Sequence, residues 1–454
     1  MSYLDDALNV ESFIANNQVE TTAGICWNRI PDSKPTHTFY HGSAGIIAYY
    51  IELYLATGET SFQDTAMAAG DDLLAYVQKQ ADEKTFITCG FFSGWPGYVF
   101  TLHQLYKLTA DDKYLKGAEL ALTRLTEQSS KIGAGIGWVE PIPFSDITGI
   151  KGERELIDFS VGSAGAGLIY IYAHRNGFGD DALARAVETA DRLLEVGEAT
   201  EHGTQWLMMV DMAFPFTAPN FAHGSAGVGY FFADLYQDTE DERYLDAAKS
   251  AADYVMANTH QRDQGFLVCH NKEEDPARTF YLGVCHGPAG TGRLMYLLAM
   301  LTEDRQYFTW LEENFLGLES TGAPETRSRG LWQNHSQCCG DAGIGDYALY
   351  LYQETGKQRY LDFAERVAQY LIKHAHSSED NSTEDNSSAE SGAEGLSWDQ
   401  AEHRSNPDFL ERQTGYMQGA AGIGSFLVHL GTTLDKQPVK LIMPDTPFLL
   451  SHSD

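Results

Sequence analysis

A small-residue signature, G-x-x-G, recurs seven times along this chain of 454 residues. One such match carries almost no information, but seven in similar contexts form an internal repeat. Each copy of a repeat must bury its apolar face against its neighbours, so this feature limits the possible folds more than any other. The first glycines of the seven copies are Gly42, Gly94, Gly162, Gly224, Gly287, Gly340 and Gly419.

Each signature opens an apolar run that is typical of a helix, as in residues 45–57 and 343–355. Glycines at the start of such a run suit a tight turn and a close backbone approach. A short polar turn and a second run follow. In the second run, as in residues 360–371, apolar residues recur at i, i+3, i+4 and i+7. The pattern predicts a helical hairpin of about 50–60 residues in each repeat.

The two helices of each hairpin are expected to differ in burial. The first is apolar nearly all round and the second is half polar, which indicates an inner ring of buried helices and an outer ring of amphipathic ones. Repeat seven has an inner run at residues 422–430 but no good outer run after it. The N-terminal run at residues 4–15 is predicted to supply that partner and close the ring. The glycine turns would then share one rim of a single domain, residues 1–454.

One segment breaks the repeat. Residues 376–394 are rich in Ser, Asp, Glu and Asn and almost free of apolar side chains. This composition predicts a disordered acidic insertion between repeats six and seven, more simply a solvated loop than a regulatory arm.

Charge and cysteine content narrow the classes of function. There are 31 Lys and Arg against 64 Asp and Glu, a net charge of −33, which disfavours nucleic acids and anionic membranes as partners. The start, MSYLDDALNV, does not resemble a signal peptide, and the apolar stretch at residues 44–56 is too short to cross a bilayer. Two of the six cysteines are adjacent, which suits a disulfide framework poorly. We therefore expect a cytoplasmic protein with reduced thiols.

Three cysteines stand at similar places, just before the glycine turns of repeats five and six. They are Cys285, Cys338 and Cys339. Neighbouring turns on one rim would bring the thiols together, and three thiolates suit a Zn²⁺ site with an open fourth position. The alternative is that they are buried as small apolar residues, as free cysteines often are.

Other Cys and His residues are weaker candidates for the metal. The pair Cys269 and His270 lies outside any glycine signature and is interpreted as structural. His286 and His335 lie close to the three cysteines in sequence, so either is a possible ligand or a hydrogen-bond partner of one. His41 precedes the turn of repeat one and is also interpreted as structural.

Together, these features resemble the lanthionine synthetase C-like family over essentially the whole chain. The resemblance implies an all-α fold, an α/α toroid (barrel) of seven inner and seven outer helices. It also implies a zinc ion held by Cys285 and by the pair Cys338 and Cys339. Cys339 stands where the family usually has histidine, as in a subgroup with three cysteine ligands.

The resemblance implies two catalytic residues as well. Asp158 lies four residues before the third-turn glycine, and His223 directly precedes the fourth. The family also has an arginine shortly before the zinc cysteine. Here Tyr281 holds that position, and Arg278 lies three residues upstream. The polar segment at residues 398–404 is a possible substitute for this arginine, or simply a surface loop.

The function predicted from these features is zinc-dependent thioether formation. A peptide cysteine would add to a dehydroalanine or dehydrobutyrine of the same peptide, with His223 as the acid that protonates carbon and Asp158 orienting it. The seven repeats leave no room for a dehydratase domain, so dehydration would need a separate protein, or a substrate made elsewhere. The alternatives are addition of glutathione or another small thiol, and a non-catalytic peptide-binding toroid with a structural zinc. A carbohydrate-active toroid ranks last because the glycine rim lacks paired carboxylates.

Overall fold

The computed structural model describes residues 2–30, 33–142, 151–212, 219–270, 280–326, 331–376, 395–404 and 406–448. The body of the predicted acidic insertion, residues 377–394, lies outside these ranges, as does Arg278. None of the described helices is long and apolar enough to cross a membrane.

Helices dominate the described residues, and they follow the predicted hairpins in pairs. The pairs are α2 (Ser43–Thr57) with α3 (Thr60–Asp82), α4 (Trp95–Thr109) with α5 (Asp112–Gln128), α7 (Ser163–Arg175) with α8 (Ala182–Val196), α9 (Ser225–Thr239) with α10 (Glu242–Ala257), α11 (Pro288–Thr302) with α12 (Arg305–Ser320), and α13 (Asp341–Thr355) with α14 (Gln358–Lys373). The remaining two helices are α1 (Tyr3–Asn16) and α15 (Ala420–Leu434). Each repeat thus begins its first helix at the residue directly after the first glycine of its signature.

The chain forms two compact units. The first comprises residues 1–79, 101–115 and 333–441, and the second comprises residues 80–100, 116–332 and 442–454.

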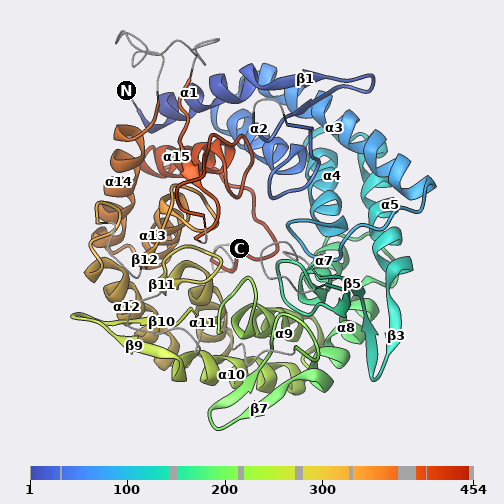
Figure 1. Ribbon diagram of the computed structural model, residues 1–454, viewed down its shortest axis with the longest axis vertical. Helices are drawn as coiled ribbons and strands as arrows, with labels where there is room; N and C mark the ends of the chain where they lie inside the picture. The colour runs from blue at the N-terminus through green and yellow to red at the C-terminus, as the bar shows by residue number, and fades with distance from the viewer. Residues whose placement is uncertain are drawn as a thin grey trace. The chain divides into compact units, whose positions relative to one another are not determined.

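In the first unit, α13 packs against α14, and α15 packs against α1, α2 and α13 (Figure 1). A capping box between Ser2 and Asp5 starts α1. The hydroxyl of Tyr49 on α2 donates to the carbonyl oxygen of Ala7 at 2.5 Å. The predicted N-terminal partner of repeat seven is therefore confirmed as α1.

In the second unit, α7 packs against α8, α9 against α10, and α11 against α12. The first helices also contact each other, α7 with α9 and α9 with α11. Within α9 every residue from Ser225 to Leu235 is buried. In α8 burial is restricted to one stripe that includes Ala182, Ala186 and Leu193. The predicted contrast between an apolar first helix and an amphipathic second helix is confirmed here, and α13 and α14 show it in the first unit.

The second glycine of the signature is needed for close approach. A Cβ atom on Gly290 would collide with the carbonyl oxygen of Val284, and one on Gly422 with that of Tyr416. Glycine therefore lets the turn fold back over the first residues of its own helix.

Short strands connect the helices, and the sequence pattern did not predict them. Four hairpins follow second helices: β1 (Gln18–Glu20) with β2 (Ile25–Trp27), β3 (Ser130–Ile132) with β4 (Gly135–Gly137), β7 (Glu198–Thr200) with β8 (Gly203–Gln205), and β9 (Thr259–Gln261) with β10 (Phe266–Val268). Two further antiparallel pairs are β5 (Val139–Pro141) with β6 (Glu153–Glu155) and β13 (Gln400–Ala401) with β14 (Leu410–Glu411). The parallel pair β11 (Phe280–Tyr281) and β12 (Leu331–Trp332) runs into the turns that carry the candidate cysteines.

A buried ionic cluster joins α2, α13 and α15 inside the first unit. His429 Nδ1 lies 2.8 Å from Asp346 Oδ1, and its Nε2 lies 2.9 Å from Glu52 Oε1. Burial acts to lower the pKa of His429, but the two carboxylates outweigh it and raise the pKa to about 10. The histidine is therefore a cation that holds three first helices together.

Candidate metal and acid–base site

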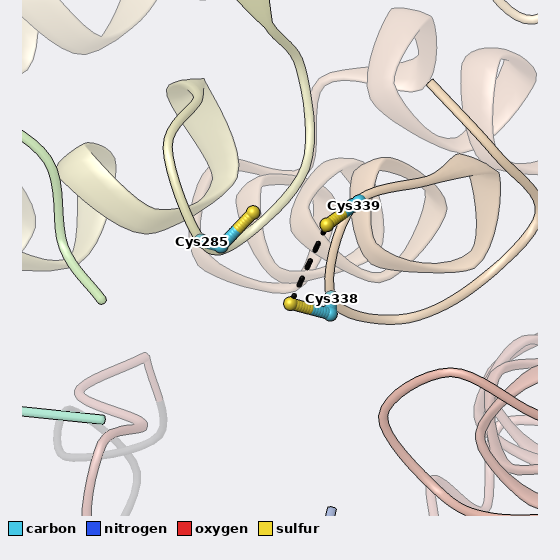
Figure 2. Close-up of side chains that lie close together, drawn as sticks. All are labelled: Cys285, Cys338 and Cys339. Atoms are coloured by element: carbon cyan, nitrogen blue, oxygen red, sulfur yellow. Dashed lines mark hydrogen bonds between the residues drawn. The ribbon is translucent and has the colours of Figure 1, made fainter. Parts of the chain in front are cut away.

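Three buried cysteines converge. Each side chain offers one sulfur, and the sulfurs of Cys285, Cys338 and Cys339 all lie within 4.8 Å of one another. The three residues are between 3% and 7% exposed. Figure 2 shows their side chains, and its dashed line marks the hydrogen bond from Cys339 Sγ to Cys338 Sγ, which lie 3.6 Å apart. All six cysteines are free thiols, so this group is a set of possible metal ligands and contains no disulfide.

The repeat itself places these cysteines. We number the two residues before the first glycine of each signature as positions −2 and −1. A backbone N–H at position −2 donates to the carbonyl at position −2 of the next turn. In the second unit this series runs from Ser160 to Ala222 at 3.0 Å and from Ala222 to Cys285 at 2.9 Å. In the first unit it runs from Cys338 to Met417 and from Met417 to Tyr40, at 2.9 Å each.

Within each unit, this series of hydrogen bonds makes the position −2 residues of successive turns neighbours, although they lie far apart in sequence. Each link pairs one backbone N–H with one carbonyl oxygen, so these groups have partners although the turns are buried.

The predicted acid–base pair lies in the second unit and is assembled in the same way. His223, at position −1 of repeat four, places its Nδ1 2.8 Å from Asp158 Oδ2. Asp158 is fully buried, and its Oδ1 accepts the N–H of Val161 at 2.8 Å. The side chain of His223 is 17% exposed, so its ring is accessible from solvent. The carboxylate of Asp158 is 0% exposed and is not accessible. The carboxylate fixes the ring orientation.

The other predicted histidines are not part of the cysteine group. His335 Nδ1 lies 2.8 Å from Asp341 Oδ2. The ring of His286 packs among His223, His270 and Tyr281, with centroid distances of 5.4, 4.6 and 4.8 Å. Among the described residues, the one group of three or more potential ligands contains the three cysteines alone.

The role of the segment at residues 398–404 could not be decided from the sequence. In the structure, this segment contributes Glu402 to a cluster of charged and polar side chains. Glu402 Oε1 lies 3.0 Å from His41 Nε2, and Glu402 Oε2 accepts from Arg29 at 3.0 Å. Burial acts to raise the pKa of Glu402, but the contact with His41 and the amide of Gln413 outweigh it and lower the pKa to about 2. Like His223, His41 is a position −1 histidine paired with a carboxylate from the preceding repeat. Position −1, which His41 shares with His223, is the sequence signal that could have identified this pair.

Two more residues next to the cysteines were not predicted. Gln418 Nε2 lies 3.7 Å from Cys339 Sγ and donates to Tyr40 Oη at 2.9 Å. Burial, followed by the nearby Cys338 and Cys339, raises the pKa of Tyr40 well above its ordinary value. Tyr40 is therefore a phenol that can donate a hydrogen bond. These residues stand at position −1 of repeat seven and position −2 of repeat one.

A further buried carboxyl lies near the acid–base pair. Glu140 is fully buried, and its Oε1 accepts the N–H of Cys89 at 2.8 Å. Burial, with a smaller contribution from Asp158, raises the pKa of Glu140 to about 7 despite that hydrogen bond. The sulfur of Cys89 in turn contacts the carbonyl oxygen of Val161, whose N–H binds Asp158.

The model of the family described as "Lanthionine synthetase C-like protein" matches residues 35–439. The chain belongs to the lanthionine synthetase C-like family. The group of Cys285, Cys338 and Cys339 fits the predicted subgroup with three cysteine ligands.

Two solved structures are similar to this lanthionine synthetase C-like chain. Nisin cyclase is 14% identical, with 91% of this chain and 92% of nisin cyclase covered at a TM-score of 0.58. A D-mannose isomerase is 12% identical, with 95% of this chain and 97% of the isomerase covered at a TM-score of 0.52. At such identities the likeness shows the fold alone. The predicted fold class, the all-α toroid of the family, is confirmed.

Proposed function

We propose that this protein is a zinc-dependent, lanthionine cyclase-like enzyme that adds a cysteine thiol to a dehydroalanine or dehydrobutyrine of a peptide. The observation that carries the proposal is the convergence of three buried cysteine sulfurs within 4.8 Å of one another. An all-sulfur donor set of this kind suits Zn²⁺ and leaves a fourth position for a ligand from outside.

Cys285, Cys338 and Cys339 would hold the metal. When bound, Zn²⁺ would supply Lewis acidity that lowers the pKa of a thiol and keeps it nucleophilic at neutral pH. The alternative of a structural zinc needs a fourth protein ligand. The pairing of His335 with Asp341 and the packing of His286 do not favour either histidine for that role.

The remaining chemistry falls to His223 and Asp158. As the thiol sulfur bonds to the β-carbon, the alkene electron pair moves to the α-carbon and its carbonyl, and the thiol proton is lost. His223, with Nδ1 held by Asp158, would donate a proton from Nε2 to the α-carbon. One thiol proton is released and one carbon is protonated, so the overall reaction is an isomerisation of the peptide.

The peptide would arrive already dehydrated, through a separate dehydratase. A sugar-processing role is less well supported by the rim. None of the residues at positions −2 and −1 is Asp or Glu, whereas glycoside hydrolysis needs two carboxylates.

The test is incubation of the zinc-loaded protein with a peptide that holds one cysteine and one dehydroalanine. Cyclisation leaves the mass unchanged but removes the free thiol, so an alkylating reagent reports it. We expect thiol loss with wild-type protein and with Cys269→Ala, a buried cysteine outside the group. We expect none with Cys285→Ala. If the peptide instead gains one glutathione only when glutathione is present, the small-thiol reaction replaces ring formation.

A further inference from the structure

The turns of repeats seven and one reach the cysteines of repeat six through side chains that carry no charge. Gln418 Nε2 points its N–H groups at Cys339 Sγ, 3.7 Å away, and at Tyr40 Oη, 2.9 Å away. The hydroxyl of Tyr40, which accepts from Gln418, lies close enough to the side chain of Cys338 to interact with it. Two neighbouring sulfurs therefore each face one neutral donor, and the two donors are hydrogen bonded to each other.

A buried network fixes the orientation of these donors. Asn334 Nδ2 donates to Gln418 Oε1 at 3.0 Å, so the amide oxygen is occupied and the NH₂ group faces the sulfur. Asn334 Oδ1 accepts from the Ser336 hydroxyl at 2.7 Å. The Ser336 oxygen accepts the N–H of Cys339 at 3.2 Å. Gln418, Asn334 and Ser336 are all between 0% and 6% exposed. Such a fully connected network holds one arrangement of the site.

The net charge of the metal-bound site explains why hydrogen-bond donors are needed beside the cysteines. Three thiolates around a divalent ion leave one net negative charge in a buried place, which is costly unless hydrogen bonds spread it. A site with histidine in place of Cys339 would be neutral and would not need this compensation. Neither donor carries a negative charge that would add to the excess.

We propose that Tyr40 and Gln418 are positioning residues that donate hydrogen bonds to Cys338 and Cys339 and stabilise the all-cysteine metal site. The inference rests on the proposed zinc site and extends it to the turns of repeats seven and one. Residues of this kind, which contact the ligands and not the metal, commonly change metal affinity by about 10- to 100-fold.

The experiment is a zinc titration of the metal-free full-length protein against a chromophoric chelator. The variants are Tyr40→Phe and Gln418→Leu. Matched controls are Tyr50→Phe, whose hydroxyl binds Glu11 at 3.0 Å, and Gln353→Leu, whose amide binds Thr433 at 3.1 Å. Circular dichroism and thermal unfolding confirm that each variant folds. Tyr40→Phe removes a single oxygen atom, so it keeps the test available if Gln418→Leu is unstable.

We expect each test variant to bind zinc about 10-fold more weakly than wild type, and each control within about twofold of it. In the cobalt-substituted protein, the sulfur-to-metal charge-transfer band should move to lower energy in the test variants and stay in place in the controls. If wild type binds zinc tightly and the test variants match the controls in both measurements, the inference is wrong while the proposed zinc site stands. A wild-type protein that binds no zinc would overturn both.

Discussion

At the scale of single residues, the side chain that can transfer a proton is distinct from the carboxylate that holds this side chain in place. His223 is reachable from outside, whereas Asp158 behind it is fully buried and bound by a backbone N–H. A carboxylate in this position favours one tautomer of the imidazole and stabilises its protonated form. His41 is also paired with a carboxylate, that of Glu402, which is partly exposed and is bound by side chains.

The His223 pair yields the first prediction. His223→Gln should lower the rate of thioether formation by about 100-fold or more, since loss of a general acid commonly costs this much. Asp158→Asn should also slow the reaction, because the ring loses its fixed orientation. Zinc content should stay at the wild-type value in both variants. His202→Gln, in an exposed turn, serves as the control. A variant that loses zinc together with activity would contradict an acid–base role.

Glu140 gives a prediction about pH. Its pKa is raised from 4.5 to about 7 because it is buried, so the folded state binds the proton more tightly than the unfolded state. The contribution of protonated Glu140 to the free energy of unfolding is fully present below pH 4.5 and is lost as pH rises through 7. This loss amounts to at most about 3 kcal/mol.

The variant Glu140→Gln cannot ionise and should escape that loss. We expect its free energy of unfolding, relative to wild type, to increase between pH 5 and pH 8, as measured by denaturant titration at each pH. Glu198→Gln, on an exposed strand position, should show no such trend. Parallel curves for Glu140→Gln and wild type would mean that Glu140 is ionised throughout.

At the scale of elements, the helical hairpin was predictable because the repeat shows it seven times. Burial patterns along α9 and α8 match the predicted inner and outer helices. The sequence even identified α1 as the partner of α15, since repeat seven lacked an outer helix. The short strands were not predicted, because strands of two or three residues are too brief to show a period.

The candidate site was only partly predictable for a related reason. Cysteine and histidine are chemically distinctive, so Cys285, Cys338, Cys339 and His223 could be found by residue type. Tyr40, Gln418 and Glu402 are ordinary residue types, and they come from repeats one and seven. Their roles depend on tertiary contacts between segments more than 300 residues apart, such as Gln418 with Tyr40. Position within the repeat was the only clue to Tyr40 and Gln418.

The packing of α1 on α15 leads to a prediction about stability. Phe13 lies on the buried face of α1 and is 2% exposed. Phe13→Ala should lower the free energy of unfolding by about 3–5 kcal/mol, as for other large-to-small changes in a core. Asn16→Ala, exposed at the end of the same helix, should change it by less than about 0.5 kcal/mol. Denaturant titration measures both. Equal, small effects would mean that α1 is not part of the folded core.

At the scale of the whole molecule, family membership supports the toroid, and the single-domain organisation over residues 1–454 stays a prediction. The net charge of −33 is the main property that the site does not explain. Such a charge destabilises a compact state through self-repulsion, and salt screens it over about 10 Å at 0.1 M and about 3 Å at 1 M.

We therefore expect the midpoint of thermal unfolding to rise by several degrees when sodium chloride is increased from about 0.1 M to about 1 M. Calorimetry with the zinc content held constant measures this change. A midpoint that falls with salt would show that favourable ion pairs outweigh the repulsion between like charges.

The measurement that tests the central claim most directly is the metal content of gently purified protein, beside Cys339→Ala and the control Cys269→Ala. Cys339 belongs to the group of three sulfurs, and Cys269 is buried outside it. We predict about one zinc ion per chain in wild type and in Cys269→Ala, and a clear loss in Cys339→Ala. A wild-type protein without zinc, or a Cys339→Ala variant that keeps it fully, would contradict the three-cysteine site and the thiol chemistry proposed for it.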